Sequence, residues 1–537
     1  MLTLSNFYKS LSRLLAATIL LFITCSTLKS VSASEDDKFS VLAPALAHVD
    51  IKNNHLAASS AEQTLVRKLE SVIWMQVGDD IDGEFFCDAS GTSAATNSAG
   101  SRVIVGAPLH DGGNNDAGHA RVLEDQNGEW VQIGSDIEGT TVNEVSGQSV
   151  AMNNDGDKVI IGSPGKIGEN SIPGIARIFK EENSEWVQLG SDLFGDAAGD
   201  LFGYSVDMNG EGTRVIIGGY NHDGGSGGLN SGHAKVFEEA NGQWVQIGGD
   251  IGGEGRSDAS GWSVAMNDEG NRVIIGAINN DGENGSNSGH ARIFEEDSNG
   301  NWIQIGEDLD GEAVDNFFGH NVDINGVGDR VIIGAIGNSN PNGFVAGHAR
   351  VFEESNGTWI QLGSDIDGES MTDLSGTQVS MNQEGSRVLI TAIGNAGDNN
   401  GLGVGHARVY DYKSGDWDQV GNDINGETSF DAFGQSAAMN DEGSRIVIGT
   451  GANDGNGPNT GHVRVYEQTG TPMTAAPTLA PTPRPGTNCR SYTSKPSCRS
   501  NECVWFDSAQ ICLSCKNIPK RKICVFKGCT WRNGACS

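Results

Sequence analysis

The chain has 537 residues, and its 70 acidic and 35 basic side chains give a formal net charge of −35. So acidic a protein is repelled by phosphate backbones, which disfavours binding to nucleic acid or to an anionic membrane surface. Hydrophobic residues make up 37% and charged residues 20%, a balance that excludes a disordered chain and fits a folded protein whose 76 glycines form many turns.

The first 33 residues have the pattern of a secretory signal peptide. Lys9 and Arg13 precede the apolar run 14–25, and the small residues Val31 and Ala33 stand at the −3 and −1 positions of a cleavage site. An uncleaved membrane anchor is the alternative, but about 12 apolar residues are fewer than the roughly 20 needed to cross a bilayer. We therefore expect a secreted or extracellular protein, with no transmembrane segment after cleavage.

Residues 34–72 form a leader without the pattern that follows. The sequence Ser-Ala-Glu-Gln at 60–63 resembles a capping box before a short amphipathic helix, and Arg67-Lys68 is a candidate processing site. We expect a surface helix or a loose leader rather than a propeptide.

Between residues 74 and 467 one unit of about 57 residues repeats seven times. Each unit has four segments of strand character, for example 130–136, 202–209, 272–277 and 289–295, joined by turns rich in Gly, Asn and Asp. Units of this kind bury their faces only against their neighbours, so they predict an all-β fold, a seven-bladed β-propeller of four-stranded antiparallel blades. A linear solenoid is the alternative. The repeat is marked by Trp74, Trp130, Trp186, Trp244, Trp302, Trp359 and Trp417.

The order of the segments predicts how the ring closes. The array begins with a tryptophan segment at 73–81 and ends with a fourth segment at 461–466 that no tryptophan segment follows. If the tryptophan strand is the outer strand of each blade, 73–81 completes the blade formed by 429–467. Such closure removes the open ends of a linear array.

Phenylalanine–glycine pairs in the second segment connect the repeat to a known family. The pairs are Phe202-Gly203, Phe318-Gly319 and Phe433-Gly434, and the third segment of the first unit ends in Gly106-Ala107-Pro108. The repeat resembles the FG-GAP repeat of integrin α-subunit propellers and of many secreted proteins, over residues 74–467. Only three units keep Phe-Gly and only the first keeps Gly-Ala-Pro, so the resemblance implies the fold more strongly than a ligand.

The same resemblance implies a calcium hairpin between the second and third segments, of the form D-x-N-x-D-G-x-x-D. The nearest match is Asp207, Asn209 and Glu211, whose side-chain oxygens suit Ca²⁺. The closing carboxylate is absent, and Arg214 stands beside its place. A plain hairpin turn is the alternative.

Three polar positions recur around the ring, and we interpret them as structural because ligand sites usually break symmetry. An aspartate follows each tryptophan by six residues, and basic residues precede the third segment and lie within the fourth, which predicts ion pairs within or between blades. A histidine opens the fourth segment in six units, and we expect hydrogen-bonded structural histidines rather than a metal-binding or pH-sensing ring. These are His119, His233, His290, His348, His406 and His462.

The loop between the third and fourth segments varies most between units. Its Asp, Asn and His side chains make it the candidate ligand face, able to hold Ca²⁺, sugar hydroxyls or a protein; flexible connectors are the alternative. The candidate residues are His110, Asp111, Asn221, His222, Asp223, Asn280, Asp281, Asn453 and Asp454. Asn284 and Asn356 lie in N-glycosylation sequons.

The C-terminal region predicts two disulfide modules. A Pro/Thr-rich linker, 468–487, precedes two tandem four-cysteine modules in 488–537, each with three possible pairings. Secretion favours disulfides over zinc ligation. Cys87 stands apart, as a buried apolar residue or as a thiol for an intermolecular bond. The cysteines of the modules are Cys489, Cys498, Cys503, Cys512, Cys515, Cys524, Cys529 and Cys536.

The C-terminal region and the rest of the mature chain differ in the sign of their net charge. Residues 484–537 hold ten basic and two acidic side chains, whereas residues 34–483 carry a net charge of −46. We find no catalytic motif and expect a non-enzymatic binding protein with an adhesion or matrix role. Its partner is an extracellular protein or polysaccharide, and the basic module is a candidate anchor to anionic glycan or matrix. An extracellular glycan-acting hydrolase or lyase is the alternative.

Overall fold

The computed structural model describes residues 73–469, apart from 113–114, 167–171, 225–226, 398–400 and 456, together with four short strands near the C-terminus. The described residues form strands, turns and loops, and none of them belongs to a helix that could cross a membrane. The predicted signal peptide, the leader 34–72 and most of the Pro/Thr-rich linker lie outside these residues. The last propeller strand runs to Thr469, two residues beyond the predicted boundary.

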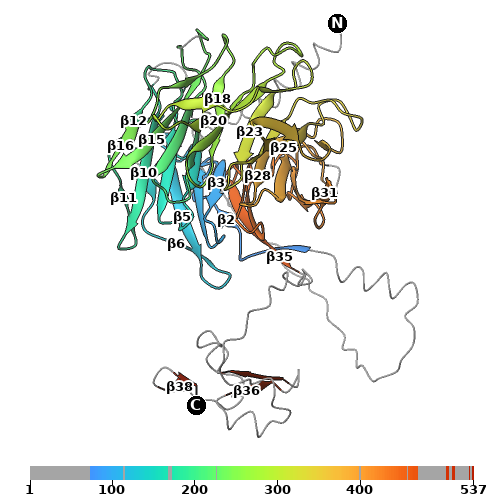
Figure 1. Ribbon diagram of the computed structural model, residues 1–537. Helices are drawn as coiled ribbons and strands as arrows, with labels where there is room; N and C mark the ends of the chain where they lie inside the picture. The colour runs from blue at the N-terminus through green and yellow to red at the C-terminus, as the bar shows by residue number, and fades with distance from the viewer. Residues whose placement is uncertain are drawn as a thin grey trace, which may run out of the picture. The chain divides into compact units, whose positions relative to one another are not determined.

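Seven antiparallel sheets form the blades of the propeller, as predicted (Figure 1). Each inner strand lies next to the inner strands of the two neighbouring blades, which makes the ring. The inner strands are β3 (Ser93–Thr96), β8 (Ser149–Met152), β13 (Ser205–Met208), β18 (Ser260–Met266), β23 (Phe318–Ile324), β28 (Ser375–Met381) and β33 (Ser436–Met439).

The second and third strands form the middle of each blade. Second strands are nearly continuous β-branched runs that are buried on both faces. They are β4 (Arg102–Ala107), β9 (Lys158–Ser163), β14 (Arg214–Gly219), β19 (Arg272–Ala277), β24 (Arg330–Ala335), β29 (Arg387–Ala392) and β34 (Arg445–Thr450). The third strands are β5 (His119–Asp125), β10 (Ile175–Glu182), β15 (His233–Ala240), β20 (His290–Glu296), β25 (His348–Ser355), β30 (His406–Lys413) and β35 (His462–Thr469).

The outer strand of each blade is split into two pieces that pair with the same third strand. The tryptophan pieces are β6 (Trp130–Gln132), β11 (Glu185–Gln188), β16 (Gln243–Gln246), β21 (Trp302–Gln304), β26 (Thr358–Gln361), β31 (Asp416–Gln419) and β1 (Ile73–Gln76). The short pieces are β7 (Ile137–Glu138), β12 (Leu193–Phe194), β17 (Ile251–Gly252), β22 (Leu309–Asp310), β27 (Ile366–Asp367), β32 (Ile424–Asn425) and β2 (Ile81–Asp82). We number the blades 1 to 7 from β3, so that blade 7 contains β33–β35, β1 and β2.

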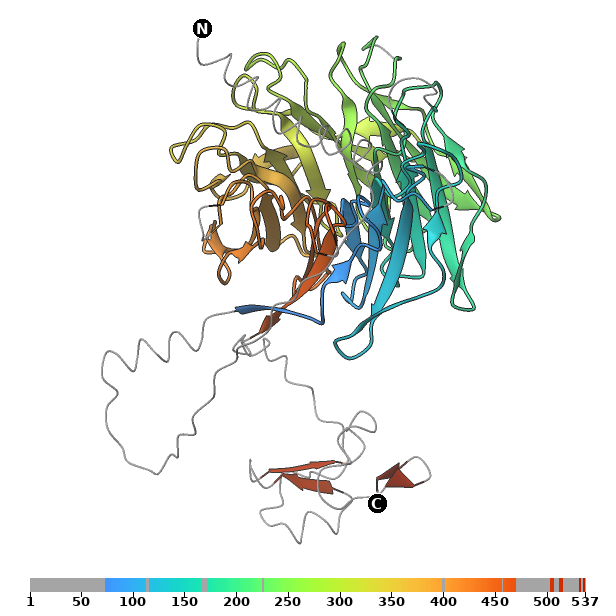
Figure 2. The ribbon, with the colours of Figure 1, turned by 180° about the vertical axis from the view of Figure 1, so that it is seen from behind.

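The ring closes as the sequence predicts. β1 pairs with β35 in antiparallel register, with Trp74 opposite Gln468, so the first strand of the repeat completes the last blade (Figure 2). Apolar clusters fill all seven contacts between neighbouring blades, and the cluster that joins blade 7 to blade 1 includes Ile81, Val103 and Val447.

Three sets of hydrogen bonds run around the ring, one bond of each kind per blade. Each tryptophan Nε1 donates to a backbone carbonyl of the preceding blade at 2.7–3.2 Å, including Trp74 to Val420. The first residue of each second strand, an arginine or Lys158, donates to a glycine carbonyl of the next blade at 2.7–3.2 Å. Arg445 to Gly100 closes that set.

The third set consists of backbone bonds at the turns between inner and second strands. Seven amides each donate to the carbonyl of the equivalent residue in the next blade at 3.0–3.2 Å, and the bond from Asp441 to Ser98 closes the circle. We call this circle the amide ring and its end of the propeller the turn face. Its members are Ser98, Asn154, Gly210, Asp268, Gly326, Gln383 and Asp441.

The glycine of each Phe-Gly position is required by the backbone. Gly203 has φ +88°, and a Cβ there would lie 2.5 Å from the Ile175 carbonyl oxygen. The phenylalanines Phe202, Phe318 and Phe433 are fully buried. The motif is therefore a tight connection into the inner strand.

Residues 473–537 form a separate unit. It contains the strand pairs β36 (Cys503–Phe506) with β37 (Ile511–Ser514) and β38 (Trp531–Arg532) with β39 (Ala535–Cys536). The cysteine side chains, and with them the predicted disulfides of the two modules, lie outside the part that the structure describes.

We predict that β1 is needed for a stable ring. A chain that begins at residue 81 leaves the edge of β35 unpaired and removes buried Trp74, which should cost about 3–5 kcal/mol or more. Urea unfolding measures the loss, and a chain that begins at residue 73 is the control. Equal stability of the two chains would contradict closure by β1.

Candidate functional site

The end of the propeller opposite the turn face carries the longer connections, and we call it the loop face. Loops between second and third strands and connections from outer strands to the next inner strands meet there, because neighbouring strands run in opposite directions. Both kinds of connection pair across blades; Thr372 N, for example, donates to the Phe344 carbonyl at 3.0 Å. The loop face is therefore the main candidate for recognition.

A buried acidic or amide residue shapes each connection into an inner strand. It lies three residues before the motif glycine and is 0–4% exposed, and Asp88 is typical because its carboxylate accepts from Phe85 N at 2.8 Å. Our reading of the sequence missed this position, although the recurring [DEN]-x-x-G pattern signals it. The residues are Asp88, Glu144, Asp200, Asp258, Asn316, Asp373 and Asp431.

The predicted loop histidines and asparagines contact these buried acids. His110 Nδ1 lies 3.1 Å from Asp88, His222 Nδ1 lies 3.1 Å from Asp200, and Asn280 Nδ2 donates to Asp258 at 3.3 Å. Asn221 donates to the Gly199 carbonyl at 2.8 Å, and Asn453 accepts from Gly455 N at 2.8 Å. These side chains fix the loops to the blades.

The predicted loop aspartates cap their own loops. Each accepts from a backbone amide five to seven residues later, at 2.8–3.0 Å. The structure therefore gives loop-shaping contacts to every one of them, and it does not gather them at one point. They are Asp111, Asp223, Asp281 and Asp454.

The aspartate that follows each tryptophan by six residues belongs to a line of contacts within its blade. The glutamine of the same outer strand donates to it at 2.7–2.8 Å. In the six blades that have the third-strand histidine, its Nδ1 lies 3.5–4.0 Å from this aspartate. The sequence predicted hydrogen-bonded histidines here, whereas these contacts with the aspartates are longer than ordinary hydrogen bonds.

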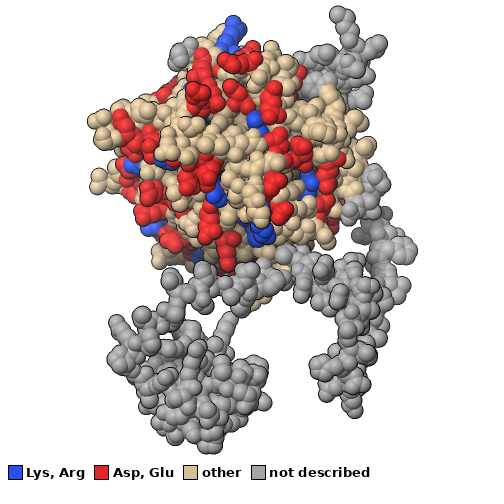
Figure 3. All heavy atoms as spheres, turned by 45° about the vertical axis from the view of Figure 1, so that its right-hand side comes forward, with Lys and Arg blue, Asp and Glu red and all other residues tan. Residues whose placement is uncertain are grey.

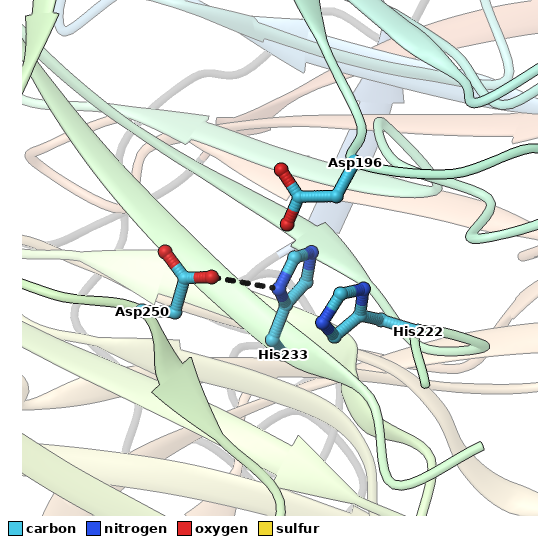
Figure 4. A group of neighbouring side chains, drawn as sticks. All are labelled: Asp196, His222, His233 and Asp250. Atoms are coloured by element: carbon cyan, nitrogen blue, oxygen red, sulfur yellow. Dashed lines mark ion pairs between the residues drawn. The ribbon is translucent and has the colours of Figure 1, made fainter. Parts of the chain in front are cut away.

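Blades 1 and 3 each have a second histidine, stacked on the first. In blade 3 the His222 and His233 rings lie 3.8 Å apart at 12°, with Asp196 and Asp250 beside them (Figure 4). In blade 1 the rings of His110 and His119 lie 4.0 Å apart at 20°. His233 Nδ1 is 3.5 Å from Asp250, and Lys235 Nζ is 2.6 Å from Asp196.

This arrangement is not preformed for a metal ion. Nearly parallel rings point their nitrogen lone pairs in parallel directions, whereas a shared metal requires them to converge. The ammonium of Lys235 also already neutralises Asp196. The stacked pair acts as a rigid link between a loop and a third strand.

Burial keeps the inner histidine of each pair neutral. It lowers the pKa of His119 to about 3 and that of His233 to about 4, assisted by the neighbouring histidine and basic residue. Burial also acts to lower the pKa of His110, but the hydrogen bond and the charge of Asp88 outweigh it, so the His110 pKa is raised. The pKa values of His110 and His119 are therefore shifted in opposite directions.

The residues of the predicted calcium hairpin have other partners. Asn209 Oδ1 accepts from Thr213 N and Arg214 N at 2.8 Å, and in every blade an equivalent asparagine accepts from the first backbone amide of the second strand. Asp207 accepts from Met266 N of the next blade at 2.7 Å, and Glu211 is exposed. Asn209 is thus a turn-forming residue, and Asp207 faces a neighbouring blade.

The remaining predicted sites are the two glycosylation sequons and Cys87. The sequon residues Asn284 and Asn356 are exposed. Cys87 is 1% exposed and disulfide-bonded, so it is not the free thiol that one interpretation required.

Exposed apolar side chains gather on the loop face, which the sequence did not predict. Eight of them, 50–69% exposed, come from the two kinds of connection there. Phe344 and Met371 lie on paired loops, as do Leu402 and Phe430, whose backbones bond at 2.7 Å. We call these eight the apolar crown: Phe85, Val142, Leu229, Val314, Phe344, Met371, Leu402 and Phe430.

Comparison with known proteins supports the fold. Residues 254–294, which include β18–β20 of blade 4, match the FG-GAP repeat family. This chain is a seven-bladed β-propeller in which one segment matches the FG-GAP repeat. FG-GAP repeats are typical of extracellular proteins and suit a recognition scaffold.

Similarity to characterised proteins is otherwise distant. No curated protein sequence matches the chain. Among solved structures it is similar to a putative 6-phosphogluconolactonase from Bacteroides uniformis ATCC 8492, at 12% identity and a TM-score of 0.43, over 63% of this chain and 86% of that one.

We predict that His233→Gln makes stability less sensitive to acid. Because the folded-state pKa of about 4 lies below the ordinary 6.5, the unfolded chain takes up a proton first, and stability falls as pH drops from about 6.5 towards 4. Between pH 7 and 4.5 the variant should lose roughly 2 kcal/mol less than the parent in urea unfolding. An exposed control, Glu307→Gln, should keep the parental slope; an unchanged slope in His233→Gln would contradict the assignment.

Proposed function

We propose that this chain is a secreted, non-enzymatic recognition protein whose apolar crown binds an extracellular protein. The observation that carries the proposal is the crown itself. Large apolar side chains exposed on one face cost free energy in water, and partner-binding surfaces use them. The residues of the crown lie on loops that a rigid ring of blades positions, which limits the entropy lost on binding.

Charge narrows the class of partner. Acidic side chains outnumber basic ones on the side of the propeller that Figure 3 shows, and residues 34–483 carry a net charge of −46. A partner that covers the crown brings its own rim close to these carboxylates. We therefore propose a protein with an apolar patch inside a basic rim, since opposite charges steer association and like charges oppose it.

Replacing one side of the crown should abolish partner binding. The variant Phe344→Ser, Met371→Ser, Leu402→Ser, Phe430→Ser removes four exposed apolar side chains from neighbouring blades. Affinity for the partner, found on an array of extracellular proteins and measured by surface plasmon resonance, should fall by about tenfold or more. The melting temperature should not change, because these side chains are already in water.

A matched control separates the crown from general surface hydrophobicity. Val187→Ser, Val245→Ser, Ile303→Ser, Ile360→Ser removes four side chains of 47–57% exposure from the outer strands. Affinity should stay at the parental value. Equal losses in both variants would contradict the crown as the binding surface, and turnover of an arrayed polysaccharide would favour the enzyme alternative.

We further propose that the basic segment 484–537 anchors the protein to anionic glycan or matrix. Ten basic side chains against two acidic ones give it the opposite sign to the propeller. Deletion of 484–537 should abolish retention on heparin-Sepharose at about 0.15 M NaCl, where exposed charges more than roughly 8 Å apart are screened. The full chain is the reference, and retention of the truncated chain would contradict the anchor.

A further inference from the structure

The entrance to the axis of the propeller breaks the sevenfold symmetry. One residue in each blade directly follows the motif glycine, just before the inner strand in four blades and as its third residue in the other three. The seven are Thr92, Gln148, Tyr204, Trp262, His320, Thr377 and Gln435. Blades 3, 4 and 5 place rings where the other four place small or linear polar side chains. Residues that recur in every blade serve the scaffold. The rings that only blades 3, 4 and 5 carry therefore need another explanation.

The rings form one aromatic surface across three blades. Tyr220, at the end of β14, joins Tyr204 at a centroid distance of 4.6 Å, and both contact Trp262, at 4.8 Å and 4.9 Å. His320 lies 6.0 Å from Trp262. All four residues are intermediate between buried and exposed, so the cluster reaches solvent with part of its surface. We call it the aromatic platform.

Below the platform, the acidic residues of the inner segments are not matched by lysine or arginine. The seven inner segments, from the residue after the motif glycine to the amide ring, contain four aspartates and neither lysine nor arginine. Asp207 accepts from Met266 N and Asp323 from Met381 N, each at 2.7 Å. Asp268 accepts from Gln383 Nε2 at 2.6 Å, and Asp441 is the fourth.

These carboxylates lack a basic partner in the inner segments. Removal from water raises the pKa of Asp207 to about 7 and that of Asp323 to about 6, and the charge of Asp323 adds to the effect at Asp207. Burial lowers the pKa of His320 to about 4, so His320 is neutral at neutral pH and supplies no compensating charge. Any positive group that enters from outside therefore gains attraction from the inner strands.

The aromatic platform lies at the loop-face end of the inner segments. At the turn face the amide ring joins all seven blades through backbone bonds of 3.0–3.2 Å, and the Gln383–Asp268 bond crosses blades there. A ligand that enters at the loop face meets the aromatic platform first and the carboxylates behind it.

We propose that the aromatic platform binds an alkylammonium group. A cation over the face of a tryptophan or tyrosine is attracted to the negative face of the ring, and tryptophan is the strongest such partner. The acidic inner strands behind the platform add a field of the correct sign, whereas a neutral sugar gains from the rings alone. The site is separate from the apolar crown, so it does not depend on a protein partner.

Choline and its uncharged isostere 3,3-dimethyl-1-butanol test the proposal on the full chain. Isothermal titration calorimetry should show saturable choline binding that weakens as NaCl rises, and at least about tenfold weaker binding of the isostere. Trp262→Gln introduces the residue that blades 2 and 7 carry at this position, and it should abolish choline binding. Gln435→Ala, across the axis, should leave binding unchanged.

A second variant separates charge from stacking. In Asp207→Asn, Asp323→Asn the amide oxygens can still accept from Met266 N and Met381 N, so the fold is retained while the charge is removed. Choline affinity should fall towards that of the isostere. Absence of choline binding, equal binding of the isostere to the parent, choline binding that survives Trp262→Gln, or binding of cellobiose in place of choline would each overturn the proposal. None of these results bears on the crown.

Discussion

The fold depends on bonds that pass from each blade to the next and return to the first. A blade of four short strands has two apolar faces and cannot bury either alone. Each tryptophan indole reaches back to the preceding blade, and each second-strand arginine or lysine reaches forward to the next. Because the array is circular, Trp74 and Arg445 make the same bonds across the closure that their equivalents make elsewhere. No interface is terminal, so none is left open.

This cyclic constraint explains why most recurring polar residues are structural. The asparagine at each turn holds the backbone that donates to the amide ring, and the buried acid of each connection holds the chain that enters an inner strand. Both positions are fixed by backbone geometry that is identical in all blades. Residues can then differ between blades only where the backbone geometry permits it. These positions are the loop tips and the residue that follows each motif glycine, and we expect functional residues there.

The sequence predicted the ring well and the candidate sites poorly, for a physical reason. Tryptophan spacing, alternating strands and the offset of the tryptophan segment at 73–81 are periodic signals that survive without coordinates. The apolar crown has no such signal, since Phe344 and Met371 are distant in sequence and differ in type between blades. At the predicted calcium hairpin Asn209 follows Asp207 in a ligand-like spacing, and the turn itself uses the asparagine oxygen.

Charge and apolar surface act together on the loop face. An exposed crown invites self-association, because a second copy offers the same apolar residues. The acidic surface around it opposes that outcome, since two copies brought crown to crown place like charges in contact and desolvate them. The same carboxylates favour a partner of opposite sign, and they favour a cation at the axis, where the inner segments carry four aspartates and no basic residue. We thus expect the acidity that disfavours nucleic acid to favour basic partners and cations at the loop face.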